Sequence, residues 1–164
     1  MNTNQLKLKL EKKDKSICAD SKIGYVTLPL FLIYQKLFNA IEHLLHTGYN
    51  LTSSELDVLA SLHDSKEDEY TLTPTKLYER LFFSSGGMTK VLKKLEQKEF
   101  INRIDNVEDK RSKLVQLTLS GKKIIEESIS DIIELEEKMF AHINEEDRES
   151  LSGLLFKSLE GMED

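Results

Sequence analysis

The sequence predicts a mainly α-helical protein with one small β-hairpin, arranged as a winged helix-turn-helix with further helices before and after it. Two short amphipathic segments, joined by a turn of about three residues, have helix-turn-helix spacing. Two segments of alternating apolar residues follow and enclose a charged turn, which is typical of a β-hairpin wing. Long apolar stripes outside this region predict amphipathic helices at both ends of the chain.

Composition limits the class of protein. The 164 residues are 39% hydrophobic and 32% charged, which suits a folded domain with its own core. No apolar run approaches the roughly 18 residues of a membrane span. The Lys-rich start, residues 1–15, is not followed by an apolar segment with a cleavage site, so we expect no secretory signal. The single cysteine, Cys18, excludes an intramolecular disulfide and favours a reducing, cytoplasmic location.

The expected organisation is a polar N-terminal arm, residues 1–22, followed by a single domain, residues 23–164. The winged lobe covers about residues 51–117, and helices at about 25–47 and 118–162 flank it. Residues 71–117 hold 10 Lys and Arg against 6 Asp and Glu, a net +4 within a chain of net −6. A basic segment in an acidic protein indicates a local surface for an anionic partner.

The first helix is predicted to start near Pro29, because proline suits the first turn of a helix. A 4-3-4-3 spacing defines its apolar stripe, which consists of Leu30, Tyr34, Leu37, Ile41 and Leu44. Such a seam suits packing against another helix, including one from a second subunit. Gly48 is expected to end it.

The second helix begins with two local signals. Thr52 and Glu55 have capping-box spacing, and Leu51 and Leu56 have the spacing of a hydrophobic staple. We expect this helix to reach His63 and to bury Leu56, Leu59 and Leu62.

The helix-turn-helix itself follows. Thr73 is the expected N-cap and Pro74 the first residue of a short helix that ends before a turn at residues 82–84. The next helix starts at Ser84 or Ser85 and runs to about Glu99. Its predicted core face consists of Met88, Val91, Leu92 and Leu95.

The wing and the C-terminal helices complete the pattern. Residues 101–104 and 114–117 alternate as strands around a charged tip at residues 106–110. Thr118 is expected to start a long helix with an acidic outer face, and Asn144 is expected to cap a final helix.

The outward face of the helix at residues 85–99 is the candidate DNA surface, because the second helix of such a motif enters the major groove with its N-terminal residues leading. Hydroxyls can contact bases or phosphates, glycines allow close approach, and lysines neutralise phosphates. The candidate residues are Ser84, Ser85, Gly86, Thr89, Lys90, Lys93 and Lys94. The alternative is an ordinary amphipathic helix with a solvated basic face.

The wing tip is the second candidate contact. Lys110 and Arg111 lie at or beside the turn, where an arginine can enter a narrow minor groove. Asp109 cannot favour phosphate, so we assign it the role of orienting Arg111 or fixing the turn. The alternative is a solvated charged loop.

These motifs together resemble the MarR family of bacterial regulators. The similar segments are Leu51-Thr52-x-x-Glu55, residues 84–96, Ile101-x-Arg103, Asp109-Lys110-Arg111 and Leu117-Thr118-x-x-Gly121, within about residues 25–162. The resemblance implies a winged helix-turn-helix homodimer with terminal dimerisation helices, a pseudo-palindromic operator, and in many members loss of DNA affinity on binding a small ligand or on oxidation. It also adds Arg103 to the DNA-binding candidates. One departure concerns the turn after the DNA-reading helix, where Glu99-Phe100 replaces the family's usual glycine.

Three further groups of residues invite a chemical role. Cys18 invites a redox-sensor interpretation, but it lacks a clearly electropositive neighbourhood. His43 and His46, beside Glu42, could bind zinc if further ligands converged, yet solvated or interface histidines are commoner, so we expect no metal. The aromatics Tyr25, Phe31 and Tyr34 could line an effector pocket or belong to the core. No catalytic motif is recognisable, so we expect neither an enzyme nor a cofactor.

The sequence therefore predicts a homodimeric regulator, acting as a repressor, that binds double-stranded DNA and responds to a small-molecule effector, with no membrane partner. The alternative is a winged-helix module for protein–protein interaction without sequence-specific DNA binding. A small-molecule-binding protein without DNA activity would leave the basic surface unexplained.

Overall fold

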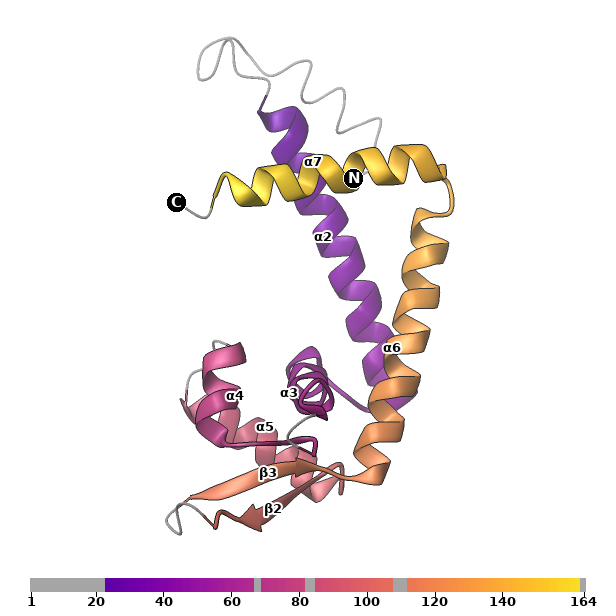
Figure 1. The fold of residues 1–164 in the computed structure, drawn as a ribbon. Coiled ribbons are helices and arrows are strands. Elements are labelled where there is room, and N and C mark those ends of the chain that lie inside the picture. The colour runs from indigo at the N-terminus through magenta and orange to yellow at the C-terminus, as the bar shows by residue number, and fades with distance from the viewer. Residues whose placement is uncertain (1–22, 67–68, 82–84, 108–111, 163–164) are drawn as a thin grey trace. The chain divides into compact units, whose positions relative to one another are not determined.

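The computed structural model describes residues 23–66, 69–81, 85–107 and 112–162. The chain divides into two compact units between His43 and Leu44, and each is considered by itself. Almost all of helix α2 (Gly24–Leu44) belongs to the first unit, and the winged lobe and C-terminal helices belong to the second (Figure 1). Among the described helices, none is long and apolar enough to cross a membrane.

Helix α2 starts at Gly24, so the prediction of a start near Pro29 is wrong. Pro29 lies inside the helix. Proline removes one donor from the hydrogen-bond ladder and its ring crowds the carbonyl four residues earlier, yet α2 continues through it. Upstream, the Val26 and Thr27 N–H groups donate to the Ile23 carbonyl at 2.9 and 3.0 Å and already form a turn. No α2 side chain is buried, so its apolar stripe is available for packing.

A π-helical turn, η1 (Leu45–Tyr49), continues from α2 and ends at Asn50. Gly48 was expected to end this helix, but it has no positive φ. Asn50 instead adopts the left-handed conformation at φ 51°, and its N–H donates to the Leu45 carbonyl. Asparagine tolerates this conformation better than most residues, which explains why the helical turn ends there.

Helix α3 (Ser53–His63) confirms the capping box. The Thr52 side chain accepts from the Glu55 N–H, and the Glu55 carboxylate accepts from the Thr52 N–H at 2.9 Å. The expected burial of Leu56 is wrong, since Leu56 is only half-buried. The buried stripe is Glu55, Val58, Leu59 and Leu62, which has helical i, i+3, i+4, i+7 spacing and leaves Leu56 one position off the face.

The helix-turn-helix consists of α4 (Pro74–Leu81) and α5 (Ser85–Gln97), and the wing of β2 (Ile101–Asp105) and β3 (Lys113–Leu117). The two strands pair antiparallel with Ile101 opposite Leu117, as predicted for a hairpin. A third strand, β1 (Thr71–Leu72), pairs with the other edge of β3 and was not predicted. Figure 1 shows α3, α4 and α5 beside strands β2 and β3.

The core of the second unit joins all these elements. It is formed by side chains with at most 2% exposure, which include Leu45, Val58, Leu59, Leu62, Leu77, Met88, Leu92, Leu95, Ile101, Val115 and Ile125. Helices α6 (Leu119–Phe140) and α7 (Glu145–Glu160) follow the wing. Thr118 and Asn144 cap them by accepting from the Gly121 and Asp147 N–H groups, as expected. The fold is therefore the mainly helical winged helix-turn-helix that the sequence predicts.

Candidate nucleic-acid interface

Helix α5 has one buried and one basic face. Met88, Leu92 and Leu95 are fully buried, and each contributes roughly 1.5–3 kcal/mol of burial free energy. This anchorage fixes which face of the helix is turned outward. Val91 is only half-buried, so three of the four residues predicted for the core face are core residues.

The outward face carries the predicted contacts. Thr89, Lys90, Lys93 and Lys94 are all exposed along α5. Within the described residues, none of the three lysines forms an ion pair with a carboxylate. Helix α5 holds three lysines against one carboxylate, that of the exposed Glu96, so its outward face has a net positive charge. Such a surface attracts the phosphate backbone of DNA.

The first helix of the helix-turn-helix starts as the sequence predicts. The Thr73 hydroxyl accepts from the Lys76 N–H at 3.1 Å and caps α4, as predicted. Ser85 begins α5 and Gly86 lies in its first turn. The side chain of Ser85 and the whole of Ser84 lie outside the described part of the chain, so the contacts of Ser84, Ser85 and Gly86 with DNA stay predictions.

The wing is described only in part. Arg103 lies on β2 opposite Val115 and is half-buried. It shares a strand face with the buried Ile101, because strand residues two apart point to the same side. Asp109, Lys110 and Arg111 lie outside the described residues, as does Cys18, so their roles stay predictions.

The turn after α5 explains how the chain manages without the expected glycine. Glu99 adopts φ 59°, and the Phe100 N–H donates to the Leu95 carbonyl at 3.0 Å. This is the left-handed C-terminal motif in which glycine is usual. The Glu99 carbonyl accepts from the hydroxyls of Thr118 and Ser120, both at 2.8 Å. The turn therefore joins the end of α5 to the start of α6.

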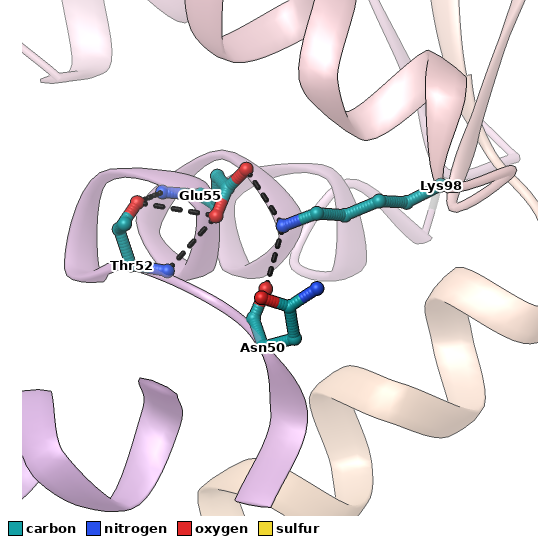
Figure 2. Close-up of polar contacts among 4 residues, drawn as sticks. All are labelled: Asn50, Thr52, Glu55 and Lys98. Atoms are coloured by element: carbon teal, nitrogen blue, oxygen red, sulfur yellow. Dashed lines mark hydrogen bonds and ion pairs between the residues drawn. The ribbon is translucent and has the colours of Figure 1, made fainter. Parts of the chain in front are cut away.

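Lys98 adds a second connection that the sequence did not reveal (Figure 2). Its Nζ donates to Glu55 Oε1 at 2.9 Å and to the Asn50 carbonyl at 2.6 Å. Glu55 is 2% exposed, whereas the Lys98 side chain is 24% exposed. The second carboxylate oxygen, Oε2, accepts from the Thr52 N–H and hydroxyl. One lysine thus joins the end of α5 to the start of α3 and to the end of η1.

Two further polar contacts attach α6 to the lobe. The Tyr49 hydroxyl donates to Asp131 at 2.6 Å, and burial together with this carboxylate raises the pKa of Tyr49 to about 12. Lys122 donates to the Tyr70 hydroxyl at 3.1 Å and lies 4.8 Å from the centre of its ring. The hydrogen bond to Tyr70 raises the pKa of Lys122 above its usual range.

The aromatic residues Tyr25, Phe31 and Tyr34 are 48%, 58% and 60% exposed. The interpretation that these aromatics belong to the core of the chain is therefore wrong. The interpretation that they line an effector pocket stays a prediction. Among the described residues, no group of three or more His, Cys, Asp or Glu side chains could hold a metal ion.

Comparison with known proteins connects this geometry to a family. The family model described as "MarR family" matches residues 51–113. Over 102 residues the chain is 35% identical to the HTH-type transcriptional regulator SarZ of Staphylococcus aureus (strain USA300). That match covers 62% of this chain and 64% of SarZ, which is less than two thirds of the relative's length.

Solved structures share the same fold. The reduced form of MarR from E. coli has a TM-score of 0.69 at 26% identity, covering 81% of this chain and 95% of that chain. MepR of S. aureus, solved as a complex with DNA, has a TM-score of 0.67 at 24% identity and covers 82% and 96% of the two chains.

Proposed function

Because this chain belongs to the MarR family of winged-helix transcription regulators, we propose that it binds double-stranded DNA as a homodimeric, ligand-responsive regulator and is not an enzyme. In this proposal α5 is the recognition helix, which docks in the major groove, and the wing tip reaches the adjacent minor groove. Two recognition helices would read a pseudo-palindromic operator with half-sites about one helical turn, 34–36 Å, apart. A DNA partner fits a cytoplasmic protein.

The basic outer face of α5 carries this proposal. Lys90 and Lys93 are exposed on a helix whose opposite face is locked into the core by Leu92 and Leu95. The buried face therefore keeps the positive stripe turned outward on the same lobe as the wing. The net charge of −6 also argues that DNA contact is confined to this lobe, because most of the remaining surface repels phosphate.

Exposed apolar faces support the homodimer. In α2, exposed side chains include Leu30, Phe31, Tyr34 and Phe38, and in α7 they include Leu154, Phe156 and Leu159. An apolar cleft of about 370 Å³ between Phe140 and α7 is lined by Leu151, Leu155 and Leu159. Contiguous apolar surface of this kind marks an interaction site. The partner that we propose for this surface is a second copy of the chain, as the resemblance to the family implies.

The experiment is operator binding at several salt concentrations. The probe is a duplex that the wild-type protein selects from random-sequence DNA, competed with unselected duplex. Lys90→Ala and Arg111→Ala should each weaken binding and lower the log–log salt slope by about 0.9 for each phosphate that is no longer neutralised. Lys123→Ala, on the exposed surface of α6, is the matched control and should change neither.

Two results would contradict the proposal. One is selection of no duplex by folded wild-type protein, together with a stable complex with another protein, which would favour the interaction module. The other is unchanged affinity of both lobe variants at fixed salt.

A further inference from the structure

Lys98 lies at the end of the recognition helix, away from the N-terminal residues that lead into a groove. It directly follows α5, and its N–H still donates to the Lys94 carbonyl at 3.0 Å, so it moves with the last turn of the helix. Its ammonium group turns toward Glu55 and Asn50 (Figure 2). A positive charge committed to a buried carboxylate is poorly placed to neutralise a phosphate.

The contacts of Lys98 add directional restraints to the apolar anchorage of α5. Met88, Leu92 and Leu95 fix the depth and the inner face of the helix by close packing. Hydrogen bonds weaken steeply when the donor is misaligned. The ammonium group of Lys98 donates two such bonds, one to α3 and one to the end of η1. These bonds therefore restrain the angle between α5 and α3.

The length of the helix amplifies this restraint. About 13 residues separate Ser85 from Lys98, which corresponds to roughly 20 Å of helix at 1.5 Å per residue. A tilt of about 3° at Lys98 consequently moves the other end of this roughly 20 Å lever by about 1 Å. That displacement is large on the scale of a hydrogen bond to a base or a phosphate.

We propose that Lys98 is a positioning residue for DNA binding: it sets the angle of the recognition helix through Glu55 and Asn50 and does not contact DNA. The functional half of this inference rests on the proposed DNA binding, whereas the orientation of α5 can be measured without DNA. Both Glu55 oxygens accept hydrogen bonds, one of them from Lys98. Loss of either charge therefore releases the same restraint.

The test uses variants of the ion pair between Lys98 and Glu55. Lys98→Met keeps most of the apolar stem and removes the charge, but it leaves a buried carboxylate without its cation, which is strongly destabilising. Glu55→Gln combined with Lys98→Met removes both charges and keeps the variant folded if the single change does not fold. Glu55→Gln alone keeps a side-chain acceptor for the Thr52 cap. Lys94→Met, one turn earlier on the exposed face of α5, is the matched control.

Affinity for the duplex selected by the wild-type protein is measured over a range of salt concentrations. We expect Lys98→Met and the double variant to bind about tenfold more weakly, with an unchanged salt slope. Lys94→Met should instead reduce the slope by about 0.9, because one phosphate is no longer neutralised. Glu55→Gln makes the protein more positive by one charge, so a purely electrostatic role predicts tighter binding, whereas positioning predicts weaker binding.

Orientation is measured on the DNA-free protein from residual dipolar couplings of the α5 and α3 amides. We expect the double variant to tilt α5 relative to α3 and Lys94→Met to leave it unchanged. An unchanged orientation, unchanged affinity of the folded double variant, or a salt slope that falls by about 0.9 on removal of the Lys98 charge would overturn the inference. If wild-type protein selects no duplex, the proposed function fails, and the dipolar couplings still decide whether Lys98 positions the helix.

Discussion

Gly121 lies in the first turn of α6, where a side chain has no room. A Cβ atom there would lie 2.1 Å from the Phe100 carbonyl oxygen and 2.9 Å from Leu117 Cδ1. The first neighbour is backbone of the turn between α5 and β2, so it cannot move without shifting that turn. Gly121→Ala should lower the free energy of unfolding by about 2–3 kcal/mol, at the upper end of overpacking effects, as measured by urea denaturation.

Gly48 supplies the control for this prediction. A Cβ atom at Gly48 meets nothing within 4 Å, and the residue lies in the helical turn η1. Gly48→Ala should therefore leave stability unchanged or raise it by about 0.5–1 kcal/mol, because alanine loses less backbone entropy on folding. Equal losses for the two alanine variants would show that steric crowding at Phe100 is not the cause.

Glu99 is a second residue whose backbone limits stability. It holds a left-handed φ of 59° in a turn that usually has glycine. Glu99→Gly should raise the free energy of unfolding by about 0.5–1 kcal/mol, since glycine adopts this conformation without strain. The urea midpoint is the measurement.

Glu99→Ala is the matched variant for that experiment. It keeps the strained φ and removes only the carboxylate, while the Glu99 carbonyl contacts to Thr118 and Ser120 involve only the backbone of Glu99. We expect its stability to stay near wild type. A gain equal to that of Glu99→Gly would assign the effect to charge instead of backbone strain.

At the scale of elements, the Tyr49–Asp131 hydrogen bond couples η1 to α6. Burial and the nearby carboxylate raise the folded-state pKa of Tyr49 from 10 to about 12. The folded state therefore holds this proton more tightly than the unfolded state. Its contribution to stability is complete below pH 10 and is lost as the pH rises from 10 toward 12.

Tyr49→Phe tests this coupling. The variant should lose stability near neutral pH, because Asp131 loses its hydroxyl donor, and its stability should fall less steeply than that of wild type between pH 10 and 12. Urea denaturation at a series of pH values measures the difference. Parallel pH profiles for the two proteins would show that Tyr49 is not the titrating group.

The starts of α3, α4, α6 and α7 were predictable because their signals are local. Thr52, Thr73, Thr118 and Asn144 each cap the backbone three residues ahead, so the pattern is complete within one turn of sequence. The same holds for the inner face of α5, where Met88, Leu92 and Leu95 have helical spacing. The basic outer face of α5 followed from that periodicity.

The missed features depend on partners far away in the chain. Strand β1 has two residues, too few for a recognisable alternation, and exists because Thr71 pairs with Gln116 of β3. The ion pair of Glu55 with Lys98 joins residues separated by 43 positions. Nothing near Glu55 in the sequence indicated this ion pair. The capping box already accounted for a glutamate at that position, so no second partner was expected.

For the whole molecule, the proposed homodimer would account for the exposed apolar side chains of α7, among them Leu154, Phe156 and Leu159. Leu159 is 57% exposed in the single chain, so a charge there should not destabilise the isolated subunit. In the proposed homodimer the same carboxylate would become buried without a cation, which costs about 3 kcal/mol or more. Leu159→Glu should therefore raise the dimer dissociation constant about a hundredfold in sedimentation equilibrium.

Lys157→Glu is the control, because it changes the net charge by more than Leu159→Glu does. Lys157 is not among the residues that line the apolar cleft between α6 and α7. The control variant should stay dimeric. Leu159→Glu should also lose affinity for a two-half-site duplex while binding a single half-site as weakly as wild type does, because each lobe is intact and only the linkage between lobes is removed. Equal dissociation of both variants would assign the effect to general charge repulsion. Dimers of undiminished affinity in Leu159→Glu would place the subunit interface elsewhere than on the apolar face of α7.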